Sequence, residues 1–130
     1  LDAAAVARHA GRGPRADRQA APHAHCILPD PSGRWAVAAD LGTDQVLVYG
    51  LTTPGLAAAS AFAMPPGAGP RHLAFAPGGR VLYVVGELDR TLTALRFDPD
   101  AGTLAPAGPA AQLADGPGAP APAAANPSGE

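Results

Sequence analysis

Two basic pairs and two acidic residues stand where this sequence could carry out chemistry. They are His23 with His25, Arg71 with His72, and the acids Asp40 and Glu87. Imidazole and carboxylate groups can take a proton from water or from a substrate, and a guanidinium is a permanent cation with several N–H donors. The set therefore suits proton transfer beside a bound anion. The alternative is structural: the acids cap hairpin N–H groups, and the histidines join neighbouring elements by hydrogen bonds.

The histidine pair could also bind a metal ion. His23 and His25 are two positions apart, so on a regular strand both side chains project from one face. Imidazole is a common metal ligand, but no third ligand follows at a recognisable spacing. We therefore predict neither a metal site nor a cofactor.

The elements that must position these residues are short β-strands. The three clearest cover residues 72–76, 80–86 and 91–97. Pro77 and two glycines form the first turn, and residues 87–90 form the hairpin that follows. Because such short connections cannot carry a parallel return, these strands form an antiparallel meander.

The same unit occurs earlier in the chain, so the sequence contains a repeat. An apolar strand begins at His25, a Pro-Ser-Gly-Arg turn follows, and a small-residue strand over 55–63 completes the unit. His25 lies 47 positions before His72, and Gly33 lies 46 positions before Gly79. Units of four strands that recur every 40 to 50 residues or so are typical of propeller blades. We therefore predict an all-β fold, a β-propeller fragment of about two four-stranded antiparallel blades.

The predicted blades place the polar residues at one location. The innermost strand of each propeller blade lines the central channel, so residues at the starts of these strands converge on one mouth although they lie far apart in sequence. We expect the following division: 1–22 as the end of a preceding blade and a connecting loop, 23–63 and 64–107 as blades, and 108–130 as a Pro/Ala-rich linker or disordered tail.

The length predicts that further blades are needed. A closed ring takes roughly four to eight blades, whereas 130 residues beginning at Leu1 hold two. We therefore expect an internal piece of a longer protein, whose remaining blades come from the same full-length chain.

Composition excludes several classes of partner. The net charge is −2 and the nine basic residues, all arginine, are scattered, which argues against a nucleic-acid partner. No apolar run approaches the ~18 residues that cross a membrane, so we predict no membrane partner and a cytoplasmic location. Cys26 is the only cysteine, and its place in an apolar strand predicts a buried, unreactive thiol.

Several motifs, taken in order, resemble one known family. They are His9-Ala-Gly-Arg-Gly-Pro with Arg18-Gln19, Pro22-His-Ala-His, Asp40-Leu-Gly-Thr-Asp, Gly69-Pro-Arg-His-Leu-Ala-Phe and Tyr83-Val-Val-Gly-Glu-Leu-Asp. Over about residues 9–104 this combination resembles the lactonase family of seven-bladed β-propellers, which includes bacterial 6-phosphogluconolactonases and is related to fungal carboxymuconate lactonising enzymes. Gly86 departs from the family pattern, which commonly has Asn there, and the family takes a further Arg from later blades.

The resemblance implies a cofactor-free hydrolase that opens a small-molecule sugar lactone, with or without a phosphate. Its site would use His23 or His25, Arg71 and Glu87. In this hypothesis Glu87 takes the proton of the attacking water, a histidine relays protons, and Arg71 binds the oxyanion or the phosphate. A neutral histidine could be the base instead. A non-catalytic interaction platform and a lyase or isomerase acting on a carboxylated lactone remain alternatives.

Strand alternation conflicts with this site if the strands are regular. Aligning His25 with His72 makes Arg71 face away from both His23 and His25. A proline lies just before each of these entries and restricts the backbone there. We therefore expect the entries to be irregular.

Overall fold

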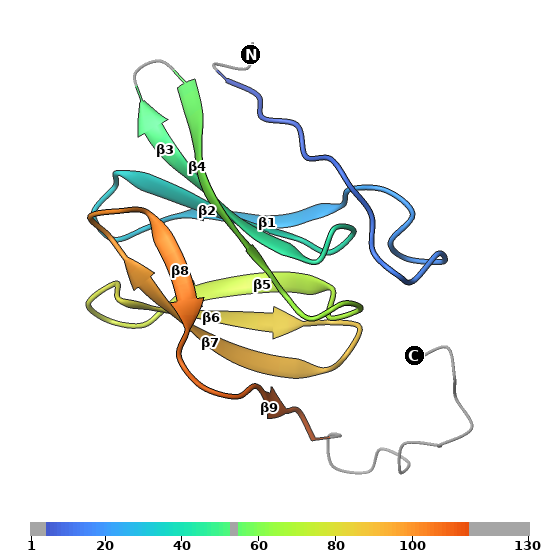
Figure 1. Cartoon of the computed structure of the whole chain (residues 1–130). Helices are drawn as coiled ribbons and strands as arrows, with labels where there is room; N and C mark the ends of the chain where they lie inside the picture. Colours follow the sequence, from blue (N-terminus) through green and yellow to red (C-terminus); the bar gives the residue numbers. More distant parts are fainter. Residues whose placement is uncertain (1–4, 53–54, 115–130) are drawn as a thin grey trace.

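A computed structural model describes residues 5–52 and 55–114, which form two antiparallel β-sheets (Figure 1). The first sheet contains β1 (Ala24–Pro29), β2 (Trp35–Asp40), β3 (Gln45–Thr52) and β4 (Gly55–Ala63). The second contains β5 (Pro70–Phe75), β6 (Val81–Gly86), β7 (Thr91–Asp98), β8 (Thr103–Pro106) and β9 (Ala111–Gln112). In this described part of the chain, no helix is long and apolar enough to cross a membrane.

Both sheets contain a four-stranded meander in which each strand pairs with the next one in sequence. The strand orders are β1-β2-β3-β4 and β5-β6-β7-β8. Short connections require this antiparallel arrangement. The predicted fold, a β-propeller fragment of two four-stranded antiparallel blades, is confirmed.

The second sheet has a further strand, β9, in the segment 108–130. We predicted a linker or disordered tail there, and the structure differs because β9 pairs with the start of β7. β8 pairs only with the later part of β7, at residues 95–98. The backbone groups at the start of β7 therefore need another partner. Gln112 reinforces the pairing, since its side-chain amide donates to the carbonyls of Asp89 and Arg90 at 3.0 Å each. Residues 115–130 lie outside the described part of the chain.

The turns repeat as closely as the strands do. Gly33 and Gly79 have φ angles of 76° and 73°, and the non-glycine residues Asp44 and Arg90 have φ angles of 56° and 57°. Each pair is 46 positions apart. A left-handed backbone is uncommon outside glycine, so its recurrence marks equivalent hairpins in the two blades.

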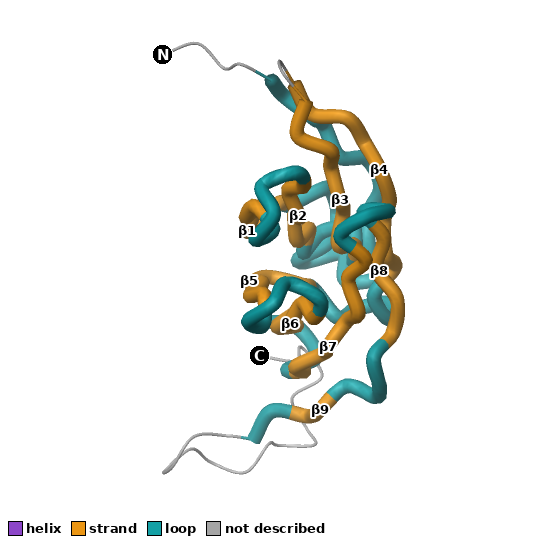
Figure 2. The backbone as a smooth tube through the Cα atoms, turned by 90° about the vertical axis from the view of Figure 1, so that its left-hand side faces the viewer, coloured by secondary structure: helices purple, strands orange, loops and turns teal. Residues whose placement is uncertain are grey.

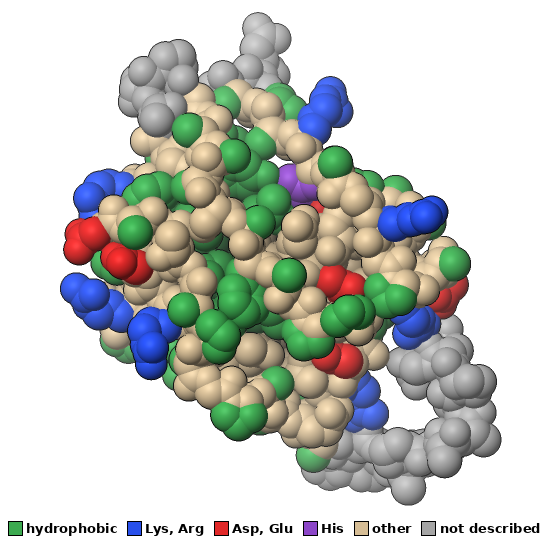
Figure 3. Space-filling model, viewed as in Figure 1, with side chains coloured by type: hydrophobic (Ala, Val, Ile, Leu, Met, Phe, Trp, Pro, Cys, Tyr) green, Lys and Arg blue, Asp and Glu red, His purple; other side chains and the backbone are tan. Residues whose placement is uncertain are grey.

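The hydrophobic core lies between the blades. β1 and β2 lie against β5, and β4 lies against β8. Figure 2 shows β1 and β5 on one side of the stacked sheets and β4 and β8 on the other. Alternate residues of the central strands fill the space between the sheets: Val37, Ala39, Val46, Val48, Leu82, Val84, Leu95 and Phe97. Figure 3 shows hydrophobic side chains through the middle of one face and charged ones toward the strand ends.

Candidate active site

The first strand of the first blade begins with a β-bulge. Ala24 faces Asp40 and Cys26 faces Ala39, so His25 is an extra residue in the ladder between β1 and β2. A bulge of this kind bends the strand and redirects side chains. Regular alternation therefore does not hold at this entry.

Arg71 occupies the same position in the second blade. The register of β5 shifts between Pro70 and His72 in the same way, so Arg71 is the extra residue. The structural equivalents are therefore His25 and Arg71, and the prediction that His25 corresponds to His72 is wrong by one residue. The expected irregular entries are confirmed, and the bulges remove the conflict over which face Arg71 uses.

Glu87 directly follows β6, and its carboxylate joins two arginines. Arg71 donates from Nη1 to Oε1 at 2.5 Å, and Arg18 donates from Nη2 to Oε2. Burial raises the pKa of the Glu87 carboxyl, but the hydrogen bonds and charges of Arg18 and Arg71 outweigh it and lower the pKa below its ordinary value of 4.5. Glu87 is therefore a carboxylate at neutral pH.

The two histidines lie beside this charged group. The rings of His23 and His25 stack with their centroids 4.9 Å apart. His25 is exposed, but partial desolvation lowers its pKa below the ordinary value of 6.5, the charge of Arg71 lowers the pKa further, and Glu87 acts in the opposite direction. His25 is therefore neutral at neutral pH and lies within electrostatic reach of both Arg71 and Glu87. The structure brings together all four predicted site residues.

Asp40 has a different position from the one expected. It is the fully buried last residue of β2, and its partner in the repeat is Gly86 instead of Glu87. Its Oδ1 accepts the backbone N–H groups of His23, Gly42 and Thr43 at 2.8, 2.9 and 3.0 Å. The expected correspondence with Glu87 is wrong, and the structural alternative, a capped hairpin, holds for Asp40.

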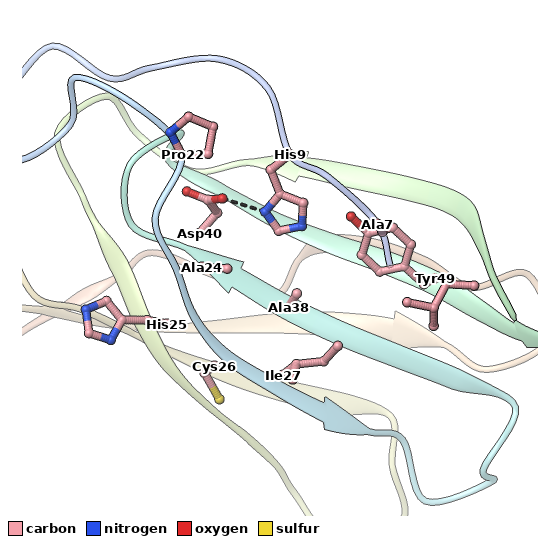
Figure 4. Close-up of a pocket in the computed structure, with 11 residues that line it drawn as sticks. Ala7, His9, Pro22, Ala24, His25, Cys26, Ile27, Ala38, Asp40 and Tyr49 are labelled. Carbon is pink, nitrogen blue, oxygen red and sulfur yellow. Dashed lines mark hydrogen bonds and ion pairs between the residues drawn. The ribbon is translucent and has the colours of Figure 1, made fainter. Parts of the chain in front are cut away.

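The other oxygen of Asp40 binds His9 from the N-terminal segment. Oδ2 lies 2.5 Å from His9 Nδ1, and the His9 ring stacks on Tyr49 at a centroid distance of 6.0 Å. These residues line a mostly apolar cavity of about 340 Å³ (Figure 4). His25 also lines it, but in Figure 4 its side chain points away from the His9–Asp40 pair.

Sequence reasoning missed Arg18 as a member of the charged group. Arg18 lies in a segment without helical or strand periodicity, and its partner Glu87 is 69 positions away. The available signal was that Arg18 belongs to the ordered motif that begins at His9. Nothing in residue spacing could show which side chain it meets.

The described residues contain no group of three or more His, Cys, Asp or Glu side chains that could hold a metal ion. His23 and His25 stack on each other but gain no third ligand of these types in this part of the chain. Cys26 is half-buried and packs against the core, so the predicted full burial of its thiol is reached only in part.

The model of the family described as "Lactonase, 7-bladed beta-propeller" matches residues 1–126. A 6-phosphogluconolactonase of Bacillus subtilis (strain 168) is 41% identical over 96 residues, which cover 74% of this chain and 27% of the relative. The chain thus spans about a quarter of that relative's length.

Solved structures from other bacteria are also similar to this chain. A protein from Lactobacillus plantarum superposes with a TM-score of 0.78 at 33% identity, covering 84% of this chain and 31% of that one. The periplasmic gluconolactonase of Pseudomonas aeruginosa superposes with a TM-score of 0.72 at 31% identity, covering 82% of this chain and 31% of that one.

Proposed function

Since the chain belongs to the lactonase family of seven-bladed β-propellers, we propose that it supplies part of the active site of a sugar-lactone hydrolase. The observation that carries the proposal is the ion pair of Glu87 and Arg71, in which Arg71 occupies the same bulge position in its blade as His25 does in the preceding one. His25 and Arg71 lie at the starts of β1 and β5, the strands that share one side of the two blades. The B. subtilis relative, named a 6-phosphogluconolactonase, supports this substrate class.

In the proposed mechanism, His25 acts as the general base. Its imidazole takes a proton from water while the water oxygen bonds to the lactone carbonyl carbon. Arg71 binds the oxygen that becomes negatively charged. The tetrahedral intermediate then collapses, the ring C–O bond breaks, and His25 returns the proton to the leaving alkoxide. General acid–base catalysis of this kind contributes roughly 10²- to 10⁴-fold to a rate.

Glu87 has a different role here from the one that the sequence suggested. A carboxylate with a lowered pKa and two guanidinium partners is a weak base. We assign it to holding Arg71 in place, and we assign His23 to supporting the His25 ring against which it stacks.

The proposed partners are the lactone substrate and the remaining blades of the full-length protein, by which we mean the whole natural polypeptide that contains this sequence. The resemblance to the family implies that a later blade adds a further arginine to the mouth. A cytoplasmic location stays a prediction, because one similar solved structure is named a periplasmic protein.

The test is the release of acid from 6-phosphogluconolactone and from gluconolactone by the full-length protein, corrected for spontaneous hydrolysis. We expect Arg71→Ala to lower kcat/KM by about 100-fold or more, the loss typical of a missing oxyanion donor. Glu87→Gln removes the carboxylate that holds Arg71 in place and should lower kcat/KM less, but by more than about threefold. Arg34→Gln is the control, because Arg34 pairs with Pro99 and Asp100 instead of with the site.

Two outcomes would contradict the proposal. If Arg71→Ala and Glu87→Gln kept kcat/KM within about threefold of the wild type, these residues would not form the site. If the wild type hydrolysed neither lactone, the proposed hydrolase function would be rejected in favour of an interaction platform or of a lyase or isomerase activity.

A further inference from the structure

We propose that Arg18 is a second anion-binding residue of this site and sets its preference for lactones that carry a phosphate. The inference rests on the proposed lactonase function and adds a residue that neither the motifs nor the comparisons assign. Its basis is the ion pair between Arg18 and Glu87, which brings a loop of the N-terminal segment to the start of the second blade.

The charged group of Arg18, Arg71 and Glu87 has more positive than negative charge. One carboxylate, Glu87, lies between two guanidinium groups, so the three side chains carry a net positive charge at neutral pH. A solvated ion pair contributes little to stability, and a single arginine would neutralise Glu87. The surplus cation is therefore available to an anionic ligand.

Both arginines keep N–H donors that their contacts with Glu87 do not use. Each has five N–H groups, and among the described contacts each gives one terminal nitrogen to Glu87. The Arg18 and Arg71 side chains are 41% and 43% exposed, whereas Glu87 is 22% exposed. Both arginine side chains are thus more exposed than the carboxylate that they share.

The loop that bears Arg18 is held in place by hydrogen bonds. The next residue, Gln19, is fully buried, and its side-chain amide donates to Asp44 Oδ1 at 2.6 Å and to the Leu41 carbonyl at 2.9 Å. The Gly13 N–H donates to the Gln19 carbonyl at 3.0 Å and closes the loop. Arg18 therefore extends from a rigid turn.

The same buried network positions Arg71. Asp44 also accepts the backbone N–H of Gly67 at 2.7 Å and that of Gly69 at 2.8 Å. The Gly69 carbonyl in turn accepts the backbone N–H of Glu87 at 2.9 Å. Because Gln19 and Gly69 share Asp44, the two backbone segments that carry Arg18 and Arg71 are held at a fixed spacing, which reduces the entropy lost on binding.

Arg18 and Arg71 then have separate tasks. Arg71 occupies in the second blade the bulge position that His25, the proposed base, occupies in the first. We assign Arg71 to binding the oxygen of the reacting carbonyl. Arg18 reaches Glu87 from the opposite carboxylate oxygen, so its free donors serve an anionic group on another part of the substrate. Guanidinium groups bind phosphate through paired N–H donors, and the B. subtilis relative is named a 6-phosphogluconolactonase, so we assign a phosphate monoester to Arg18.

The experiment compares two substrates in the full-length protein. We expect Arg18→Gln to lower kcat/KM for 6-phosphogluconolactone by about 10- to 100-fold, the effect of one charged hydrogen-bonding partner. It should lower kcat/KM for gluconolactone by less than about threefold. Arg18→Lys, which keeps the charge and loses the planar fork, should recover only part of the loss. Inorganic phosphate should inhibit the wild type more strongly than Arg18→Gln.

Arg12→Gln is the matched control, because Arg12 is an exposed arginine of the same segment without a described contact to Glu87. It should leave the ratio of the two substrates unchanged. Equal losses on both lactones in Arg18→Gln would overturn the inference and leave the lactonase function intact. Hydrolysis of neither lactone by the wild type would instead reject the proposed function, and this inference with it.

Discussion

His25 and Arg71 occupy the same position in consecutive blades, each as the extra residue of a bulge at the start of the innermost strand. The bulge frees both side chains from the alternation of the ladder. A potential base and a permanent cation therefore meet at one end of the sheets, where regular strands would separate them.

Activity should depend on the protonation of His25. Its pKa is lowered by partial desolvation and by the charge of Arg71, so the neutral, basic form prevails above a pKa that lies below 6.5. We expect kcat/KM to rise with pH and to reach its plateau by about pH 7. Arg71→Gln removes a cation and should move the His25 titration to higher pH, which NMR of the imidazole protons can follow. A His25 that titrates above pH 6.5 in the wild type would contradict this.

Glu87→Gln should destabilise the protein by only about 1 kcal/mol at neutral pH, because the arginines that it pairs with are partly exposed. The pKa of Glu87 is lowered in the folded state, so its contribution is present above the ordinary pKa of 4.5 and is lost as the pH falls through the folded pKa. Urea midpoints of wild type and variant should therefore converge in acid. A constant difference at all pH values would show that the charge is not the cause.

Asp40→Ala should be far more damaging, because it leaves three buried or partly buried backbone N–H groups without their acceptor. We expect a loss of roughly 3 to 5 kcal/mol in the free energy of unfolding. Asp40→Asn keeps Oδ1 and should cost roughly 1 to 2 kcal/mol. Asp100→Asn, at a carboxylate that is 86% exposed, is the control. Similar urea midpoints for Asp40→Ala and Asp100→Asn would contradict the structural role of Asp40.

Gly69→Ala should disturb both stability and activity. Gly69 has a φ angle of 62°, and an added Cβ would lie 2.5 Å from Leu88 Cγ. Gly78, with a φ angle of 93°, has open space around it, so Gly78→Ala measures the backbone strain alone, about 1 kcal/mol. The extra loss in Gly69→Ala, measured by urea unfolding, reports the clash. Gly69→Ala should also lower kcat/KM, because Arg71 is two positions away. Equal losses of stability in Gly69→Ala and Gly78→Ala would disprove the clash.

The strands and their repeat could be predicted because they depend on local sequence. Turns such as Pro77 to Gly79 and runs of β-branched residues determine where each strand begins and ends. The register at the strand entries could not be read in this way. Aligning the two histidines, His25 and His72, placed the repeat one residue off, because a bulge leaves no composition signal.

The sequence alone was enough to predict the all-β propeller blades and the family, and it suggested the four residues proposed for the site. Only the tertiary structure decided that Arg18 joins Glu87 across 69 positions and that Asp40 is a buried structural carboxylate. The physical reason is that strand formation follows from neighbouring residues, whereas ion pairs and buried hydrogen bonds depend on how distant segments pack. The spacing of residues along the sequence does not show which distant side chains this packing brings into contact.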